Sequence, residues 1–272
     1  MYLSNDLIDD AKNQKLMLFA GAGVSMNLGL PSWSSLIDQM DLELGFTPEA
    51  FKKLGSFLEL AEYYQLKKGS IGPLRSWMDT KFHSSNINIA DSAIHKHIVD
   101  LNFPQIYTTN YDRWLEKAHE FYKKPYDKIT GIHDFTLTHR DTTQIIKYHG
   151  DFDDDASIVF TETSYFKRLG LDTALDMKLR ADAFGKSLLF VGYSLSDIDI
   201  RFLLYKLQLL WGTGLETSIQ PKSYILLTTQ NPIQQKILES RNIETITSDE
   251  QDPGKALESF LASLAEKANP KN

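Results

Sequence analysis

The sequence contains no cysteine among its 272 residues. This absence excludes disulfide bonds and zinc sites built from thiolates. Basic charge is not in excess either, because 29 lysines and arginines stand against 36 acidic residues, a net charge of −7. A broad surface that tracks nucleic-acid phosphates is therefore not expected, and we predict no direct contact with nucleic acid.

Long hydrophobic runs are also missing. The N-terminal stretch MYLSNDLIDDAKN is polar and acidic, with neither the basic start nor the apolar core of a signal peptide. We find no run of roughly 20 apolar residues, the length that a membrane helix needs. We therefore expect a cytoplasmic protein without a membrane segment. The chain is nevertheless 42% hydrophobic, which is enough to bury a full α/β core.

The other sequence patterns are organised around the stretch KLMLFAGAGVSMNLGLPSW, residues 15–33. Its apolar run Leu16–Ala20 predicts a buried parallel strand that breaks into Gly21-Ala22-Gly23, with a helix over about 34–44 ending at Gly45. Such a glycine turn can hold a diphosphate, because glycines permit close backbone approach and free N–H groups attract anions. Taken alone, the turn fits equally well a tight connection that packs a helix on a strand.

Three further predicted strands run into polar turns. They are residues 104–109 before Asn110-Tyr111-Asp112, residues 144–148 before His149-Gly150-Asp151, and residues 186–192 before Tyr193-Ser194. Shorter strands are expected over 223–228 and 243–246. The alternation of strands with helices predicts a Rossmann-like α/β fold, a mainly parallel sheet with helices on both faces. All four polar turns would then meet at the carboxyl ends of the strands, where such sheets bind ligands.

Helical segments interrupt this alternation twice. Residues 47–100 indicate three or four amphipathic helices, and residues 152–185 indicate a solvated loop with three consecutive acids followed by helices. We expect one domain over 1–272 that carries both segments as insertions.

The seven histidines show no spacing that is typical of a metal site. His95 and His97 are two residues apart on a predicted helix, so they point to different sides, whereas zinc sites on helices use a spacing of four. We therefore predict no metal ion.

The polar turns, in their order, resemble the motifs of the sirtuin family. The resemblance covers about residues 15–230 and is carried by Gly21-Ala22-Gly23-Val24-Ser25, Gly29-Leu30-Pro31, Thr108-Thr109-Asn110-Tyr111-Asp112, His149-Gly150 and Gly192-Tyr193-Ser194. Each motif alone is common, and their order and context make the match specific. The resemblance implies a single NAD-binding domain.

Two departures distinguish this chain from the sirtuins that remove acyl groups from lysine. Those enzymes usually carry a zinc module of four cysteines between the H-G and G-x-S motifs, and this chain has no cysteine. They also tend to have an acid–phenylalanine–arginine segment where Ser32-Trp33-Ser34 stands here. The chain is more similar to bacterial sirtuin-like enzymes that hydrolyse NAD in antiviral defence. This resemblance implies a gated NAD glycohydrolase that releases nicotinamide and ADP-ribose.

The resemblance and the residue types suggest a role for each residue. Asn110 is expected to hold the ribose hydroxyls and a water near the anomeric carbon. His149 is expected to be the general base, because its ordinary pKa of about 6.5 is near the working pH. Asp112 would support the nicotinamide end or fix the Asn110 loop. Binding of NAD is assigned to Gly21, Ala22, Gly23, Ser25, Pro31, Thr109, Gly192 and Ser194, the last on the adenosine ribose.

A structural reading competes with each of these assignments. Asn110 and Asp112 are also common in turns that cap a helix such as RWLEKAHEFY. His149 is alternatively a packed residue at the end of its strand, and Ser25 and Ser194 are alternatively helix caps.

Two other functions stay open beside the glycohydrolase. One is a subunit that senses NAD or a related nucleotide without catalysis, and the other is a zinc-free protein deacylase or ADP-ribosyl transferase. The presence of both Asn110 and His149 favours the hydrolase over the sensor, because pure binding needs neither. An ungated NAD hydrolase would poison its host, so we expect control by homo-oligomerisation or by a partner in trans. The resemblance implies a translocase-type ATPase or an Argonaute-like protein as that partner.

Overall fold

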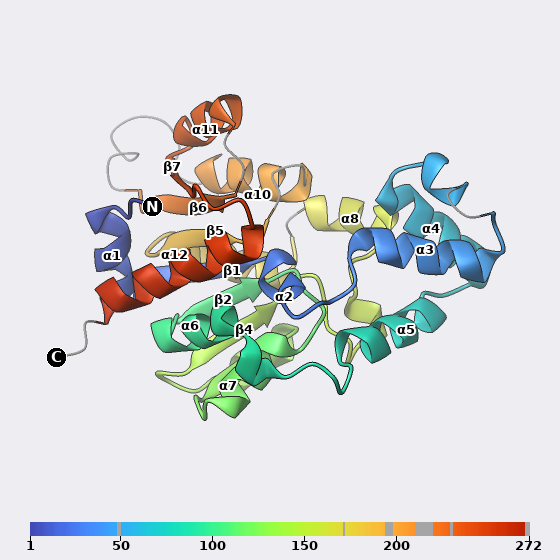
Figure 1. Cartoon of the computed structure of the whole chain (residues 1–272), viewed down its shortest axis with the longest axis horizontal. Coiled ribbons are helices and arrows are strands. Elements are labelled where there is room, and N and C mark those ends of the chain that lie inside the picture. Colours follow the sequence, from blue (N-terminus) through green and yellow to red (C-terminus); the bar gives the residue numbers. More distant parts are fainter. Residues whose placement is uncertain (48–49, 171, 194–197, 210–219, 229–230, 270–272) are drawn as a thin grey trace.

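The computed structural model describes residues 1–47, 50–170, 172–193, 198–209, 220–228 and 231–269 (Figure 1). Its centre is a seven-stranded parallel sheet with the order β3-β4-β2-β1-β5-β6-β7. The strands are β1 (Leu16–Ala20), β2 (Gln105–Thr108), β3 (Tyr126–Ile129), β4 (Thr143–Lys147), β5 (Ser187–Val191), β6 (Ser223–Leu227) and β7 (Ile243–Thr247). This arrangement confirms the predicted Rossmann-like sheet.

Helices cover both faces of the sheet, as predicted. One face packs against α1 (Asn5–Lys12), α6 (Ala93–Leu101) and α12 (Pro253–Ala268), and the other against α9 (Ala174–Ala183) and α10 (Ile198–Leu209). Strands β1 and β5 are buried at all five positions, which explains why both are continuous apolar runs rather than alternating ones.

The remaining described helices are α2 (Gly23–Met26), α3 (Trp33–Leu44), α4 (Phe57–Lys68), α5 (Gly72–Phe82), α7 (Trp114–Phe121), α8 (Glu162–Leu169) and α11 (Pro232–Glu239), with 3-10 turns at Phe51–Lys53, Ile89–Asp91, Ile132–Leu137 and Asp155–Ser157. Of these helices, α7 and α11 add to the first and the second face respectively, and α3, α4 and α5 form a separate group. The expected helix at 34–44 is α3, and it ends at Gly45, whose φ of 75° is in the left-handed region. Helices α3, α4 and α5 gather at one side of the sheet around a further hydrophobic core, to which Tyr111 and Phe152 also belong (Figure 1).

Two elements were not predicted. The strand β3, YDKI, lies at the edge of the sheet and is half-exposed at three of its four positions, so its sequence has no apolar run. Helix α2 follows the glycine turn at once, ahead of the helix that the pattern predicts, and its four residues are too few for a helical period to show.

The strand order changes direction at β1. The chain first builds β2, β3 and β4 on one side of β1, and then β5, β6 and β7 on the other. At such a switch point the loops that follow the neighbouring strands diverge and leave room for a ligand. The turns that follow β1, β2 and β5 therefore flank the expected binding position.

Candidate functional site

The glycine turn after β1 packs directly on the turn after β5. The Gly23 N–H donates to the carbonyl oxygen of Gly192 over 3.0 Å. A Cβ added to Gly21 would lie 2.6 Å from that oxygen, and one added to Gly23 would lie 2.7 Å from the Gly192 Cα. Gly192 itself has a φ of 72°. The three glycines are therefore required for the close contact of two backbone segments.

The turn after β2 reaches across to the glycine turn through Asn110. The Asn110 side-chain amide donates to the Gly21 carbonyl oxygen over 3.1 Å and to Ser25 Oγ over 3.2 Å. Its backbone N–H donates to Thr108 Oγ1 over 3.0 Å. Asn110 is only 8% exposed, and no donor in the described part of the chain bonds its Oδ1. The amide is thus held in one orientation, with its oxygen available to a ligand.

Tyr193 lies between the turns after β1 and β2. Its hydroxyl donates to the Ala20 carbonyl oxygen over 3.0 Å and lies 3.0 Å from Thr109 Oγ1. Its ring carbons lie 2.8 Å from where a Gly21 Cβ would be. In the sequence, Tyr193 stands only as the middle residue of a motif, and no local pattern indicates that its ring lies beside Gly21.

Of the remaining expected NAD-binding residues, Ser194 lies outside the described residues. Pro31 precedes Ser32, the N-cap of α3, and no hydrogen bond within the described ranges joins it to Gly21 or Asn110. Ala22 precedes α2 within the glycine turn.

Asp112 fixes the turn that carries Asn110. Its Oδ1 accepts the backbone N–H of Trp114 over 3.0 Å at the start of α7, and its carbonyl oxygen accepts a hydrogen bond from the Lys147 ammonium. The residue is 4% exposed. These contacts are those of a helix cap and a loop anchor.

His149 follows β4 and is buried among aromatic rings. It stacks on Tyr148 with 5.7 Å between ring centroids and meets Tyr165 of α8 edge-on at 5.3 Å. This burial, with a smaller contribution from the Arg168 guanidinium, lowers the pKa of His149 to about 3. The imidazole is therefore neutral near pH 7 and can accept a proton. The structure corrects the sequence-based reason for choosing His149, which assumed a pKa near 6.5.

Tyr165 and Arg168, two of the residues near His149, come from the second predicted insertion. Arg168 stacks over the Tyr148 ring at 4.2 Å and forms two hydrogen bonds with Asp176, of 2.8 and 3.1 Å. The Tyr148 hydroxyl donates to Asp176 over 2.5 Å. Arg168 and Asp176 are not predicted as site residues, because their helical patterns do not indicate that they pack near the His149-Gly150 turn.

Gly150 explains why a glycine follows this histidine. Its φ is 98°, and a Cβ there would lie 2.3 Å from the Ser157 carbonyl oxygen. The backbone N–H of Val159 donates to the His149 carbonyl oxygen over 2.8 Å. The His149 turn is thus held tightly against residues 157–159.

Two searches of the described residues bear on other classes of site. They contain no group of three or more histidine, aspartate or glutamate side chains arranged to hold a metal ion. None of the described helices combines the length and the apolar character that crossing a membrane requires.

Comparison with known proteins gives relatives that include several NAD(+) hydrolases and a defence-associated sirtuin. NAD(+) hydrolase ThsA of Enterococcus faecium is 33% identical over 190 residues, which is 69% of this chain and 38% of that protein. NAD(+) hydrolase ThsA of Bacillus cereus is 28% identical over 207 residues, 75% of this chain and 42% of that protein. Defense-associated sirtuin 2 of Bacillus subtilis is 23% identical over 240 residues, 86% of this chain and 23% of that protein. The chain thus spans well under half the length of each of these relatives.

A family model matches more than half of the chain. The model is that of the SIR2-like domain, and it covers residues 104–246, from the start of β2 to the end of β7. This range includes Asn110, His149 and Gly192. The order of the motifs, the parallel sheet and this match agree, and the chain belongs to the SIR2-like domain family.

Proposed function

We propose that this chain is an NAD glycohydrolase that cleaves NAD to nicotinamide and ADP-ribose as a gated effector of antiphage defence in the cytoplasm. One observation supports the proposal most directly. At the switch point of the sheet, the Asn110 side-chain N–H groups donate to Gly21 and Ser25 of the glycine turn, so the side-chain oxygen Oδ1 is available to bind a ligand. Relatives named NAD(+) hydrolase support the choice of substrate and reaction.

The reaction requires that the ribose and a water molecule be positioned and that a base accept a proton from that water. It requires no acid to protonate the leaving group. The bond between C1′ of the ribose and the nicotinamide nitrogen breaks with its electron pair on nitrogen, so the pyridinium leaves as neutral nicotinamide. The ribose passes through an oxocarbenium-like state, as in other glycosyl transfers. In the proposal, Asn110 orients the ribose hydroxyls and the water whose oxygen bonds to C1′.

The low pKa of His149 is compatible with the role of base. Once water has bonded to an oxocarbenium carbon, its proton is strongly acidic, so a weak base is sufficient to accept it late in the reaction. His149 is neutral and can take that proton before passing it to solvent. Asp112 then acts by fixing the Asn110 turn rather than by touching nicotinamide.

NAD binding is proposed for the residues around the switch point. These are Gly21, Ala22, Gly23, Ser25, Thr109 and Gly192, with Pro31 and Ser194 as further members. The glycines also have a structural role of their own in the contact between the two turns. Their assignment to NAD therefore rests on their place at the strand ends.

We propose that the activity is gated, because uncontrolled hydrolysis would deplete the NAD of the host cell. Homo-oligomerisation or a partner in trans, a translocase-type ATPase or an Argonaute-like protein, would supply it. No metal ion is required by this proposal.

The test measures nicotinamide release by the purified chain, alone over a range of protein concentrations and with the product of a neighbouring gene. His149→Ala and Asn110→Ala are each expected to reduce turnover by at least about 100-fold, the scale of general base and positioning effects. Binding of NAD, followed by calorimetry, should change little. His133→Ala and Asn86→Ala change exposed residues of the same types and serve as controls.

Two outcomes would count against the proposal. Binding of NAD without release in every condition would favour the sensing subunit. Full activity of an isolated monomer would contradict the proposed gating but would be consistent with NAD hydrolysis.

A further inference from the structure

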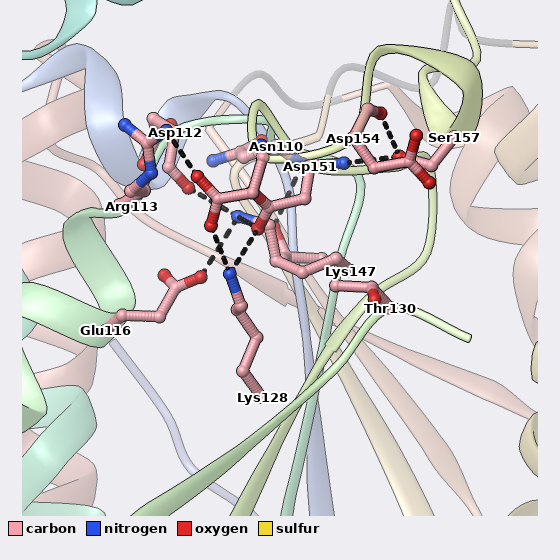
Figure 2. A network of polar contacts seen from close by, with 12 residues as sticks. Asn110, Asp112, Arg113, Glu116, Lys128, Thr130, Lys147, Asp151, Asp154 and Ser157 are labelled. Carbon is pink, nitrogen blue, oxygen red and sulfur yellow. Dashed lines mark hydrogen bonds and ion pairs between the residues drawn. The ribbon is translucent and has the colours of Figure 1, made fainter. Parts of the chain in front are cut away.

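A fully buried lysine lies beneath the candidate site. Lys147 is the last residue of β4, and its side chain has no exposed surface. Its ammonium donates to the carbonyl oxygen of Asp112 and lies 3.3 Å from Glu116 Oε1 and 3.9 Å from Asp151 Oδ2. Figure 2 shows these groups converging from different strands and turns.

The partners of Lys147 come from three separate segments. Asp112 belongs to the turn after β2, Glu116 to α7, and Asp151 to the turn after β4. Asn110 is two residues before Asp112, and His149 stands between Lys147 and Asp151. One ammonium group therefore joins the turn that carries Asn110 to the turn that carries His149.

Other contacts also join the two turns, among them the Tyr111 and Phe152 rings, whose centroids lie 6.0 Å apart, and the ion pair of Arg113 with Asp153. The backbone ladder between β2 and β4 ends where the Tyr148 N–H donates to the Thr108 carbonyl oxygen over 2.8 Å. Beyond it, the Tyr111 hydroxyl donates to the Val159 carbonyl oxygen over 2.6 Å, and Val159 in turn holds His149. Lys147 differs from these contacts in that it is fully buried and donates to a backbone oxygen, which no side-chain substitution removes.

The carboxylates around Lys147 depend on it. Within the described residues, both oxygens of Glu116 and Oδ2 of Asp151 have no hydrogen-bond partner, and both residues are at most 4% exposed. Burial raises the pKa of Glu116, whereas the Lys147 charge opposes that rise. A buried carboxylate without a nearby cation is costly, so Lys147 is needed to keep the Glu116 carboxylate in place, and it shares the Asp151 carboxylate with Lys128.

An outer ring of ion pairs surrounds this centre. Lys128 of β3 lies 3.5 Å from Asp151 Oδ2 and 2.6 Å from Asp153 Oδ2, and Arg113 lies 2.7 Å from Asp153 Oδ1. Asp153 belongs to the run of three acids that the sequence analysis expected to be a solvated loop. All three acids are exposed, as that expectation requires, and Asp153 in addition joins β3 to the residue after Asp112.

We infer that Lys147 is a positioning residue, which holds the Asn110 turn and the His149 turn at their working separation through the buried charge cluster of Lys147, Glu116, Asp151 and the Asp112 carbonyl group. It does so without contacting NAD. The consequence for turnover rests on the proposed function, whereas the consequence for the two turns does not.

The kinetic test compares Lys147→Met with the wild type under the condition in which the wild type releases nicotinamide. Methionine keeps the length of the side chain and removes the ammonium. The kcat is expected to fall by at least about 30-fold with KM within about threefold, since orientation in the transition state is lost and not ground-state binding. Lys178→Met removes the lysine of a half-buried pair with Asp182, at 3.0 Å, and should leave both constants unchanged.

Hydrogen exchange tests the same inference without NAD. In Lys147→Met, the amides of residues 109–114 and 149–159 should exchange at least about 10-fold faster, while those of β1 keep their protection. Unchanged exchange in both segments would overturn the inference. A wild type that hydrolyses no NAD would contradict the proposed function, and the exchange result would still decide the role of Lys147.

A second variant covers the case in which Lys147→Met does not fold. Combining it with Glu116→Gln removes the nearest carboxylate, so that less uncompensated charge is buried. This pair should fold and retain the loss of kcat, because the Asp112 carbonyl still lacks its donor. Wild-type kcat in the folded double variant would overturn the inference, as would wild-type kcat in Lys147→Met itself.

Discussion

The turns after β1 and β5 meet backbone to backbone, whereas the turns after β2 and β4 are joined by buried charged side chains. In the first pair, which we call the glycine half, Gly23 donates to Gly192 and no added Cβ has room. In the second pair, the charged half, Lys147 joins Asp112 to Asp151. The glycine half should therefore respond to steric changes, and the charged half to pH, salt and charge removal.

The largest expected effect comes from adding one methyl group to the glycine half. Gly192→Ala would place a Cβ 2.8 Å from the Val24 backbone nitrogen, at a φ of 72°. Strain and overlap together should lower the free energy of unfolding by about 3 kcal/mol or more. Gly185→Ala is the control, because no atom lies within 4 Å of its Cβ position and its φ is not in the left-handed region. Equal urea midpoints for the two variants would show that the turns do not pack as described.

The sequence reveals the glycine half better than the charged half. Glycines after apolar runs predict both strand ends and turns, and the structure places Gly21, Gly23 and Gly192 at such ends. By contrast, Lys147 stands in the run QIIKY, where nothing distinguishes a buried lysine from a solvated one. Its burial depends on α7 and on the turn after His149, which are distant in sequence. Local patterns cannot report a charge whose partners come from three segments.

The same limit applies to His149. Its motif is visible in the sequence, but its pKa is lowered mainly by burial among residues that include Tyr165 of α8, and to a smaller extent by Arg168 of the same helix. From the sequence, α8 is predicted only as part of a helical insertion, and its position relative to the sheet is not predicted. His149 could therefore be identified from its residue type and its place in the motif, whereas its protonation state could not be predicted from the sequence.

Acid should weaken the charged half more than the glycine half. The pKa of His149 is about 3 in the folded protein and about 6.5 when unfolded, so between these values the unfolded state binds more protons. Stability is therefore lost as the pH falls from about 6.5 toward 3, and His149 alone accounts for about 2 kcal/mol between pH 7 and pH 5. The measurement is urea unfolding at both pH values.

Two variants isolate this contribution. His149→Gln cannot titrate, so its loss of stability between pH 7 and pH 5 should be about 2 kcal/mol smaller than that of the wild type. His133→Gln, at an exposed site, should behave as the wild type does. The buried His95, whose pKa burial lowers to about 4, keeps its own acid sensitivity in all three proteins. Identical pH dependence in His149→Gln and the wild type would mean that the imidazole is not buried in solution.

The smallest effect on stability is expected for Asp153, which belongs to the outer ring of ion pairs in the charged half. Its size distinguishes the contribution of exposed charges from that of buried ones. Asp153 binds Lys128 and Arg113, and these pairs lower its pKa, but its side chain is 54% exposed. Ion pairs that face water are screened and contribute little, so Asp153→Asn should cost less than about 1 kcal/mol and less still in 1 M salt. Asp249→Asn, at an exposed position after β7, is the control in the same unfolding experiment. A salt-independent loss of several kcal/mol would mean that the outer ring, and not Lys147, holds the two turns together. A small, screened loss leaves that role to the Lys147 ammonium, whose side chain has no exposed surface.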